Sequence, residues 1–463
     1  MSATEELTLP GGDHSPHPLN EKVAMSLAPT RSVLLRRPAL AATGALALAL
    51  VLTACADGGS AAPTDPTSAD ASPVAAEVYD ESHDDDHEAE AGAAESAART
   101  PRIALTYNGG ILVLDANSGD ELADLPLDGF NRLNVAGDGR HVMVSTAGGW
   151  AALDAGTWSS AHGDHSHYFT AAPALHEVIV EAETPGHVVV HDGLTALFDD
   201  GTGEVTIVPV GDWTEAVEHG EVAPTRTYTT PSAHHGVAVA DQGGLLVVTE
   251  GDDTARTGAR LLDGSDTELA ASAECPGVHG ETVAGQHTVV LGCEDGVLVL
   301  HDDHFHKIAS PDAYGRVGNQ FGTESSDVVL GDYKSDPEGI LTKIALIDTE
   351  AESINVVDLG MQYTFRNLAR GDDDTALVIG TDGALRVIDP VSGQIVRSVP
   401  VTAAWDVPQE WQGAQPTIKV MDGMAYITEP ASNQLHIVDY ETGSVWKSIQ
   451  LSQTPIEMAV VTG

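Results

Sequence analysis

Ile111-Leu-Val-Leu-Asp115-Ala-Asn-Ser-Gly119 is a short apolar run that ends in an acidic turn closed by glycine. The same order of strand, turn and strand recurs in Gly296-Val-Leu-Val-Leu-His301-Asp302, Leu385-Arg-Val-Ile-Asp389-Pro-Val-Ser-Gly393 and Leu435-His-Ile-Val-Asp439-Tyr-Glu-Thr-Gly443. Short apolar runs bounded by Gly, Asn and Asp are typical of β-strands. We therefore predict that each segment is the third strand of a repeated sheet.

A second apolar run precedes these segments and recurs along the chain at intervals of roughly 40 to 50 residues, a period typical of β-propellers. Its copies lie at residues 103–107, 141–145, 195–198, 245–249, 288–291, 328–330, 376–379 and 425–427. The pattern predicts an all-β domain over 101–463, an eight-bladed β-propeller with no competing helix. A seven-bladed propeller is the alternative, because residues 200–230 are difficult to divide into strands.

The two ends of this domain fit the count of eight. Residues 101–128 supply three strands of a first blade, and residues 455–461 supply one strand without a partner. Pairing the two would remove the open edges that a propeller cannot leave exposed.

Residues 1–54 are predicted to be a signal peptide whose true start is Met25. Arg31, Arg36 and Arg37 precede an apolar stretch at 39–52 that is too short for an ordinary membrane span. The stretch ends in Leu52-Thr-Ala-Cys55, which resembles a bacterial lipobox. We therefore expect lipidation of Cys55 and an exported protein held on the outer face of the cytoplasmic membrane. The alternative is a cleaved, soluble, periplasmic form.

Residues 55–100 contain few large apolar side chains, so they are predicted to be a flexible tether. The tether includes a short tract of histidines and carboxylates of a type that binds metal ions. We expect this tract to be a metal capture arm, and a plain acidic linker is the alternative. Its candidate ligands are His83, Asp84, Asp85, Asp86 and His87.

With Cys55 assigned to lipid, Cys275 and Cys293 remain as a pair in an exported chain, where oxidising conditions favour a disulfide. Free thiols or thiolate metal ligands are the alternatives.

The chain carries a formal net charge of −49. Nucleic acid is therefore excluded as a partner, because phosphate binding needs a basic surface. An acidic surface instead attracts cations, although it also serves ordinary solubility. We expect a monomer that contacts the membrane through the lipid only.

Histidine is concentrated in the middle of the chain, with fifteen of the twenty residues between His141 and His306. Imidazole is a common ligand of metal ions, although any single histidine is more often an ordinary surface residue. Aligning the first strands of successive blades places Pro185-Gly-His187-Val over Pro276-Gly-Val-His279-Gly. The pair His234 and His235 falls one or two residues earlier in the blade between them.

Segment 161–168 adds further candidates just upstream, namely Asp164, His165 and His167. Residues two apart in an extended segment point the same way. Glu281 and Glu324 are weaker candidates that would orient an imidazole from behind. Three or four imidazoles with one carboxylate suit tetrahedral Zn²⁺ better than hard cations.

The histidine segments resemble those of periplasmic zinc metallochaperones of the AztD type. The residues that carry the resemblance are Gly163-Asp-His-Ser-His-Tyr168, Pro185-Gly-His-Val-Val-Val-His-Asp192, Ala196-Leu-Phe-Asp-Asp-Gly201, residues 232–236 and the His/Asp arm. The resemblance implies a propeller that binds Zn²⁺ and passes it to the solute-binding protein of an ABC zinc importer. A lipid anchor would distinguish this chain from a freely diffusing chaperone.

Two other function classes remain open from the residues alone. A propeller-bound metal ion could activate water in a hydrolase or lactonase, although the sequence has no G-x-S-x-G nucleophile motif. A protein-interaction propeller would carry its histidines on loops without a metal role. We expect a metallochaperone and not an enzyme, with no catalytic residues.

Overall fold

The computed structural model describes residues 92–163, 165–285 and 287–463. The predicted signal peptide, Cys55, the arm residues 83–87 and Asp164 lie outside these ranges. The regular secondary structure of the described residues is almost all β-strand, so the all-β prediction is confirmed. In these ranges no helix combines the length and the apolar character that crossing a bilayer requires.

Eight antiparallel sheets account for most of the described chain, and we number them 1 to 8 in chain order. Within each sheet the strands are given from the edge that contacts neighbouring sheets outward. Sheets 1 to 4 consist of β36 (Met458–Val461), β2 (Arg102–Tyr107), β3 (Gly109–Asp115) and β4 (Glu121–Leu127); β5 (Leu133–Val135), β6 (His141–Thr146), β7 (Gly149–Asp154) and β10 (Ala174–Glu181); β11 (Pro185–His191), β12 (Leu194–Asp199), β13 (Glu204–Pro209) and β14 (Arg226–Thr229); and β15 (Ala238–Ala240), β16 (Leu246–Gly251), β17 (Arg256–Leu262) and β18 (Glu268–Ser272).

Sheets 5 to 8 repeat this order, and sheet 5 has an additional short strand, β23 (Gly315–Arg316), parallel to its third strand. They consist of β19 (His279–Ala284), β20 (Thr288–Cys293), β21 (Asp295–His301) and β22 (His304–Ala309); β24 (Gln320–Thr323), β25 (Ser326–Tyr333), β26 (Lys343–Asp348) and β27 (Ser353–Asp358); β28 (Leu368–Arg370), β29 (Ala376–Ile379), β30 (Ala384–Ile388) and β31 (Ile395–Pro400); and β32 (Ile418–Met421), β33 (Met424–Glu429), β34 (Gln434–Asp439) and β35 (Ser444–Gln450).

The repeat predicted from the sequence matches this arrangement. Each of the eight recurring runs is the second strand of a sheet, and the four segments with acidic turns form third strands, namely β3, β21, β30 and β34. The predicted union of the two chain ends is also present, because β36 pairs antiparallel with β2 from Arg102↔Val461 to Leu105↔Met458.

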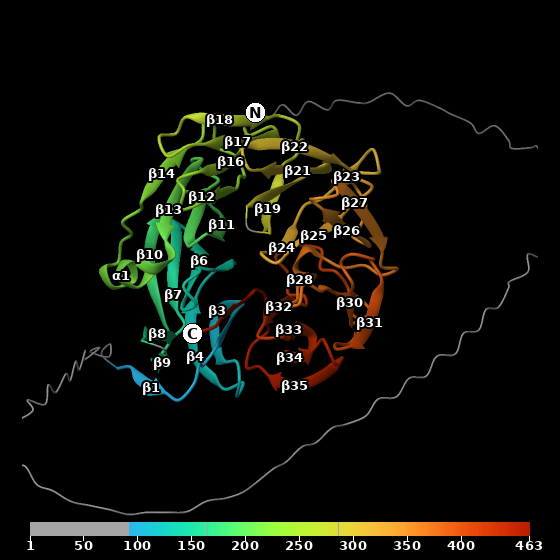
Figure 1. The fold of residues 1–463 in the computed structure, drawn as a ribbon. Coiled ribbons are helices and arrows are strands. Elements are labelled where there is room, and N and C mark those ends of the chain that lie inside the picture. Colours follow the sequence, from blue (N-terminus) through green and yellow to red (C-terminus); the bar gives the residue numbers. More distant parts are fainter. Residues whose placement is uncertain (1–91, 164, 286) are drawn as a thin grey trace, which may run out of the picture. The chain divides into compact units, whose positions relative to one another are not determined.

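Successive sheets lie against one another in chain order, as Figure 1 shows. The first strands of neighbouring sheets contact each other from β19 through β24, β28, β32 and β36 to β5, β11 and β15. Sheets 4 and 5 meet through a buried cluster that includes Val239 and Val278. Middle strands such as β3 and β20 are buried on both faces, whereas outer strands such as β4 alternate between exposed and partly buried residues. The apolar core therefore lies between the sheets.

Two insertions depart from the predicted pattern. Helix α1 (Trp213–His219) follows the turn η1 (Val210–Asp212) between β13 and β14, so the expectation of no helix is wrong at this point. Its buried residues Trp213, Ala216 and Val217 recur at helical spacing and pack on sheets 2 and 3. The remaining turns are η2 (Phe365–Asn367) and η3 (Pro430–Ser432).

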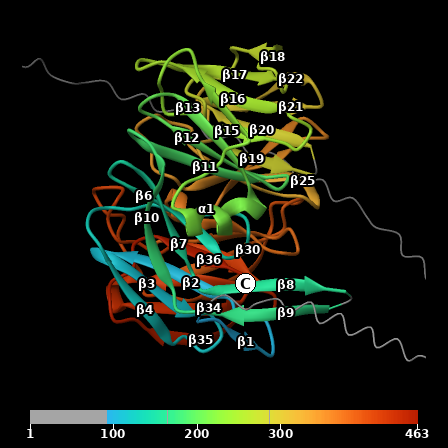
Figure 2. The same cartoon turned by 90° about the vertical axis from the view of Figure 1, so that its left-hand side faces the viewer.

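The second insertion is a hairpin of β8 (Thr157–His162) and β9 (His165–Thr170) between β7 and β10. Strand β1 (Ala94–Ser96) pairs with β9, which gives a separate three-stranded sheet. Figure 2 shows β8 and β9 running out beyond the neighbouring sheets.

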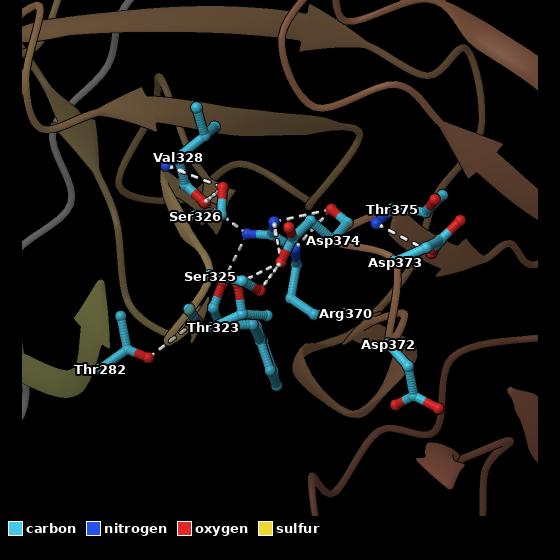
Figure 3. Close-up of polar contacts among 12 residues, drawn as sticks. Thr282, Thr323, Ser325, Ser326, Val328, Arg370, Asp372, Asp373, Asp374 and Thr375 are labelled. Carbon is cyan, nitrogen blue, oxygen red and sulfur yellow. Dashed lines mark hydrogen bonds and ion pairs between the residues drawn. The ribbon is translucent and has the colours of Figure 1, made fainter. Parts of the chain in front are cut away.

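Polar contacts also tie adjacent sheets together, for example between sheets 6 and 7 (Figure 3). The Arg370 guanidinium of β28 donates to the carbonyl oxygens of Val328 and Asp374. The Asp374 carboxylate in turn accepts from the hydroxyls of Thr323 and Ser325. Because Thr323, Ser325 and Val328 belong to sheet 6 whereas Arg370 and Asp374 belong to sheet 7, these contacts hold the two sheets together.

Candidate metal centre

Three histidines from successive sheets converge on one point. His187 lies on β11, His235 lies in the segment before β15, and His279 is the first residue of β19. Their ring centroids are 5.1 Å apart for His187 and His235, 5.6 Å for His187 and His279, and 5.0 Å for His235 and His279. One ring nitrogen from each lies within 4.8 Å of the others, a spacing that a single metal ion can span. We refer to this group as the three-histidine cluster.

Irregular strand pairing aims two of these side chains. The register of β11 against β12 shifts between Pro185 and Val188, and that of β19 against β20 shifts between His279 and Glu281. Such bulges turn side chains away from the regular alternation of a strand. The glycine beside each histidine makes room for a partner: a Cβ on Gly186 would lie 2.3 Å from Asp200 Oδ1, and one on Gly280 would lie 2.6 Å from the Gly318 carbonyl oxygen.

Each imidazole has an acceptor at its Nδ1 atom. The Nδ1 atom of His187 lies 3.0 Å from Glu281 Oε2, that of His235 lies 2.5 Å from Asp200 Oδ2, and that of His279 lies 2.6 Å from the Gly318 carbonyl oxygen. An Nδ1–H that donates to an acceptor leaves Nε2 as the free lone pair and fixes the ring orientation. The cluster therefore has three oriented Nε2 atoms available as ligands.

The orienting residues were only partly foreseen. Glu281 lies where the sequence interpretation expected it, behind an imidazole. Asp200 was missed, although it directly follows β12, whose Asp199 pairs with Pro185 at the start of β11. Glu324 instead lines a different cavity with His191.

The environment gives His187 and His279 different affinities for protons. Burial, together with the charges of the nearby His187 and His235 rings, lowers the pKa of His279 to about 3. For His187, burial acts in the same direction, but the Glu281 carboxylate outweighs it and the pKa is raised. His279 is therefore a neutral imidazole across the physiological pH range, which is the form that binds metal ions.

The cluster opens into a cavity of about 560 Å³. Part of its wall consists of the cluster and its two carboxylates, and part consists of a cation and aromatic rings from sheets 2 and 7 and the loop before sheet 8. The lining residues are Arg132, Asn134, Pro185, Gly186, His187, Val188, Asp200, His235, His279, Glu281, Asn319, Phe365 and Trp411. Three imidazoles beside an open cavity can hold a tetrahedral ion and leave its fourth position accessible.

The structure does not bring His234 into this cluster. Its ring is buried against Phe198, its Nδ1 lies 2.9 Å from the Ser232 carbonyl oxygen, and its Nε2 lies 3.2 Å from Thr249 Oγ1. Both ring nitrogens therefore already have partners in the sheet.

His165 and His167 form a second group with His162 on the β8–β9 hairpin, where one ring nitrogen from each lies within 4.8 Å of the others. His167 Nδ1 also lies 2.8 Å from Glu95 Oε1 of β1. The sequence interpretation placed His165 and His167 beside His187, but the hairpin carries them in a group of their own. Asp164, at the tip between the two strands, is outside the described residues.

The predicted disulfide between Cys275 and Cys293 is present, with 5.0 Å between the Cα atoms. It closes the segment that contains β19 and most of β20. Because His279 and Glu281 both lie on β19, the disulfide braces the part of the cluster that sheet 5 contributes.

Comparisons with known proteins agree with the resemblance seen in the histidine segments. The chain is 27% identical over 363 residues to the zinc chaperone AztD of Citrobacter koseri, a match that covers 76% of this chain and 83% of that protein. The crystal structure of Citrobacter koseri AztD superposes with a TM-score of 0.69 at 25% identity, over 79% of this chain and 99% of that chain. An apo structure of AztD from the same organism gives a TM-score of 0.68 at 24% identity, over 79% and 98% of the two chains. No family model matches the chain.

Proposed function

We propose that this chain is an extracytoplasmic zinc metallochaperone that captures Zn²⁺ and transfers it to the solute-binding protein of an ABC zinc importer. The observation that carries the proposal is the convergence of His187, His235 and His279, each with its Nδ1 held by an acceptor. The similarity to a protein named as a zinc chaperone supports the same conclusion. Zinc is then the cargo of the protein, and no catalytic residues are assigned.

The open cavity beside the cluster suits transfer rather than permanent storage. Structural zinc sites are closed by four protein ligands, whereas three ligands leave one position that an incoming group can occupy. A donor protein can then exchange ligands stepwise with its acceptor and never release bare Zn²⁺. The group of His162, His165 and His167 is proposed as a second zinc-binding group, on a hairpin that extends beyond the neighbouring sheets (Figure 2).

The eight sheets are proposed to be the blades of an eight-bladed propeller. The contacts between the first strands of neighbouring sheets and the pairing of β36 with β2 support this count over seven. The stretch that had been hard to divide consists of the turn after β12, strand β13, helix α1 and β14, which all belong to sheet 3.

We also propose that Cys55 anchors the exported chain by lipid and that the arm at 83–87 collects zinc for the clusters. The arm contributes His83 and His87 with the carboxylates between them, which are ligand types suited to Zn²⁺. Both proposals rest on the sequence.

Metal analysis of the purified full chain tests the central proposal. After dialysis against a mild chelator, His187→Ala should retain about one equivalent of zinc fewer than the unmodified chain. His219→Ala is the matched control, because this exposed ring lies on α1 beside Glu215 and belongs to neither histidine group. Retention of all zinc by His187→Ala would contradict the proposal.

Transfer is tested separately by mixing the zinc-loaded chain with a zinc-free importer solute-binding protein in the presence of a chelator that traps free zinc. Direct transfer predicts that zinc reaches the acceptor and that the chelator stays empty. Appearance of the zinc on the chelator instead would mean that the chain binds zinc but does not deliver it.

A further inference from the structure

Arg132 lines the cavity beside the three-histidine cluster, and it belongs to a group of charged side chains in which cations outnumber carboxylates. Arg132 Nε lies 3.3 Å and Arg366 Nη2 lies 2.5 Å from the same oxygen, Glu457 Oε1. Two guanidinium groups thus share one carboxylate. Lys419 on β32 also lies within electrostatic range of Glu457 and Arg132. This local excess stands out in a chain whose formal net charge is −49.

Aromatic rings hold the Arg132 guanidinium in place. Its central carbon lies 5.8 Å from the ring centroids of both Phe365 and Trp411. The central carbon of Arg366 lies 5.0 Å from the Phe365 ring centroid, and the Nη1 of Arg366 donates to the Trp411 carbonyl oxygen. Cation–π contacts of this kind restrict the side chain, so the guanidinium is oriented before any ligand arrives.

The outer end of Arg132 is left without a partner. Its side chain is 43% exposed, and its one ion pair uses Nε. Among the described residues, neither of its Nη atoms has a hydrogen-bond or ion-pair partner. The side chain of Arg366, by contrast, is only 3% exposed, pairs with Glu457 and donates from Nη1 to two backbone carbonyls, so it is not accessible to a ligand. Arg132 is therefore the group in this wall that can bind an anion in the cavity.

Arg132 and the three-histidine cluster line the same cavity of about 560 Å³. Arg132 is also close enough to His187 for its charge to oppose protonation of that ring. The two carboxylates already in the cavity, Asp200 and Glu281, are engaged with His235 and His187. Arg132 therefore lines the same cavity as the position at which three imidazoles would leave a metal ion one ligand short.

We propose that the cavity contains a carboxylate-binding position, in which one carboxylate oxygen completes the coordination of the ion at the three-histidine cluster and the other accepts hydrogen bonds from Arg132. The inference rests on the proposed zinc site. A carboxylate fits both requirements, because its oxygens ligate Zn²⁺ and match the paired donors of a guanidinium. Bound in this way, an entering carboxylate takes the fourth ligand position at the first step of zinc exchange.

The carboxylate can come from an acidic peptide or from a small anion in solution. This chain has such a peptide in Asp84, Asp85, Asp86 and Glu88. Both sources would present the same carboxylate group to the site. If the arm occupies the position, an added anion has to compete with it; if a small anion does, no such competition occurs.

The test uses Co²⁺ as a spectroscopic substitute for Zn²⁺ in the full chain carrying His165→Ala and His167→Ala, so that the three-histidine cluster is the folded site observed. Acetate is titrated at saturating Co²⁺ and followed by visible absorption. We expect Arg132→Met to weaken acetate binding about tenfold or more, as the loss of a charge-assisted hydrogen bond predicts. Arg132→Lys should show a smaller loss, because it keeps the charge without the paired donors.

Arg99→Met is the matched control, since Arg99 is 42% exposed and pairs with Asp422 away from the cavity. Its acetate affinity should equal that of the parent. A second set of proteins, the parent and its variants, also carries Asp84→Asn, Asp85→Asn, Asp86→Asn and Glu88→Gln. If the arm supplies the carboxylate, acetate binds this set more tightly than the parent; if a small anion does, both bind it equally.

The outcomes separate this inference from the proposed function. Equal acetate affinity in the parent, Arg132→Met and Arg132→Lys, with Co²⁺ bound in each, overturns the carboxylate position and leaves the metal site standing. If Co²⁺ binding by the parent does not depend on His187, both the carboxylate position and the proposed zinc site are overturned.

Discussion

Asp200, Glu281 and the Gly318 carbonyl oxygen each hold one imidazole of the three-histidine cluster by its Nδ1 atom. Two of these acceptors are carboxylates and one is a backbone carbonyl. His235 is also the most exposed of the three rings. Because His235 lies in a loop rather than on a strand, it depends on Asp200 for its orientation more than His187 depends on Glu281.

We therefore predict that Asp200→Asn lowers zinc affinity by about 10- to 100-fold, the usual cost of removing a group that orients a metal-binding histidine. Competition with a fluorescent zinc indicator measures the change. Asp128→Asn, an exposed acid outside this cavity, is the control and should leave the affinity unchanged. Equal affinity in Asp200→Asn would mean that the carboxylate does not orient the ligand.

Asp332 of β25 affects the cluster indirectly, through the backbone of Gly318. This buried carboxylate accepts hydrogen bonds from the Gly318 N–H at 2.5 Å and from Asn319 Nδ2 at 2.6 Å, and Gly318 holds His279 through its carbonyl. In Asp332→Asn the new amide would place an NH₂ group against one of these donors. We expect a loss of about 1–3 kcal/mol in unfolding free energy and weaker zinc binding, measured by urea denaturation and indicator competition. A loss of stability with unchanged zinc affinity would show that Asp332 is structural only.

Much of the cluster could be predicted from the sequence, because His187 and His279 occur in related strand openings at equivalent positions of the repeat. The acceptors could not be predicted, since Asp200 and Gly318 come from other segments of the chain. The bulges in β11 and β19 that turn the histidines toward them are also not visible in a single sequence. The position of His165 and His167 was wrongly inferred for a related reason. An inserted hairpin removes its residues from the register of the repeat, and polar strands such as β8 give little apolar signal.

At the scale of elements, the hairpin of β19 and β20 is held by the Cys275–Cys293 disulfide, which bridges 18 residues. We predict that the double change to serine, or reduction of the native chain, lowers the unfolding free energy by about 3 kcal/mol, as loop closure of this length predicts. Denaturation with and without a reductant measures this. Zinc affinity should fall as well, because β19 carries His279 and Glu281. Reduction without effect on either quantity would mean that the hairpin is held by packing alone.

A buried ion pair of sheet 2 packs against the inserted β8–β9 hairpin. Arg140 joins Asp154 through two hydrogen bonds, and its guanidinium carbon lies 4.1 Å from the Trp158 ring centroid on β8. Burial alone would raise the pKa of Asp154, but hydrogen bonding and the charge of Arg140 lower it below its ordinary value.

A depressed carboxylate pKa contributes stability at neutral pH that disappears as the pH falls through that pKa. We predict that Asp154→Asn costs about 3 kcal/mol at pH 7, because it leaves a buried guanidinium without its counter-charge. The difference from the unmodified chain should shrink below about pH 4. Urea denaturation at pH 7 and pH 3 measures both values, with the exposed Asp128→Asn as the control. A difference that stays constant with pH would exclude the charge of Asp154 as its cause.

At the scale of the whole molecule, the first sheet joins residues from opposite ends of the described chain. Its first strand is β36 and its other three are β2, β3 and β4. The backbone groups of β36 pair with β2, and Met458 contributes to a core cluster that also contains Ile103 and Leu435. Without β36, the edge of β2 would be unpaired and part of the apolar core would be exposed. An unpaired strand edge is a template for association with another chain.

Removal of residues 456–463 is therefore predicted to give a chain that aggregates or unfolds at much lower denaturant concentration. Val460→Thr keeps the backbone pairing and changes one partly buried side chain, so it should unfold nearly as the full chain does. Size-exclusion chromatography and denaturation distinguish these results. Because the three-histidine cluster draws on sheets 3, 4 and 5, its geometry depends on every sheet keeping its neighbours, and the truncated chain should also lose zinc binding. A truncated chain that stays monomeric and binds zinc as before would show that the cluster assembles without the sheet that joins the two chain ends.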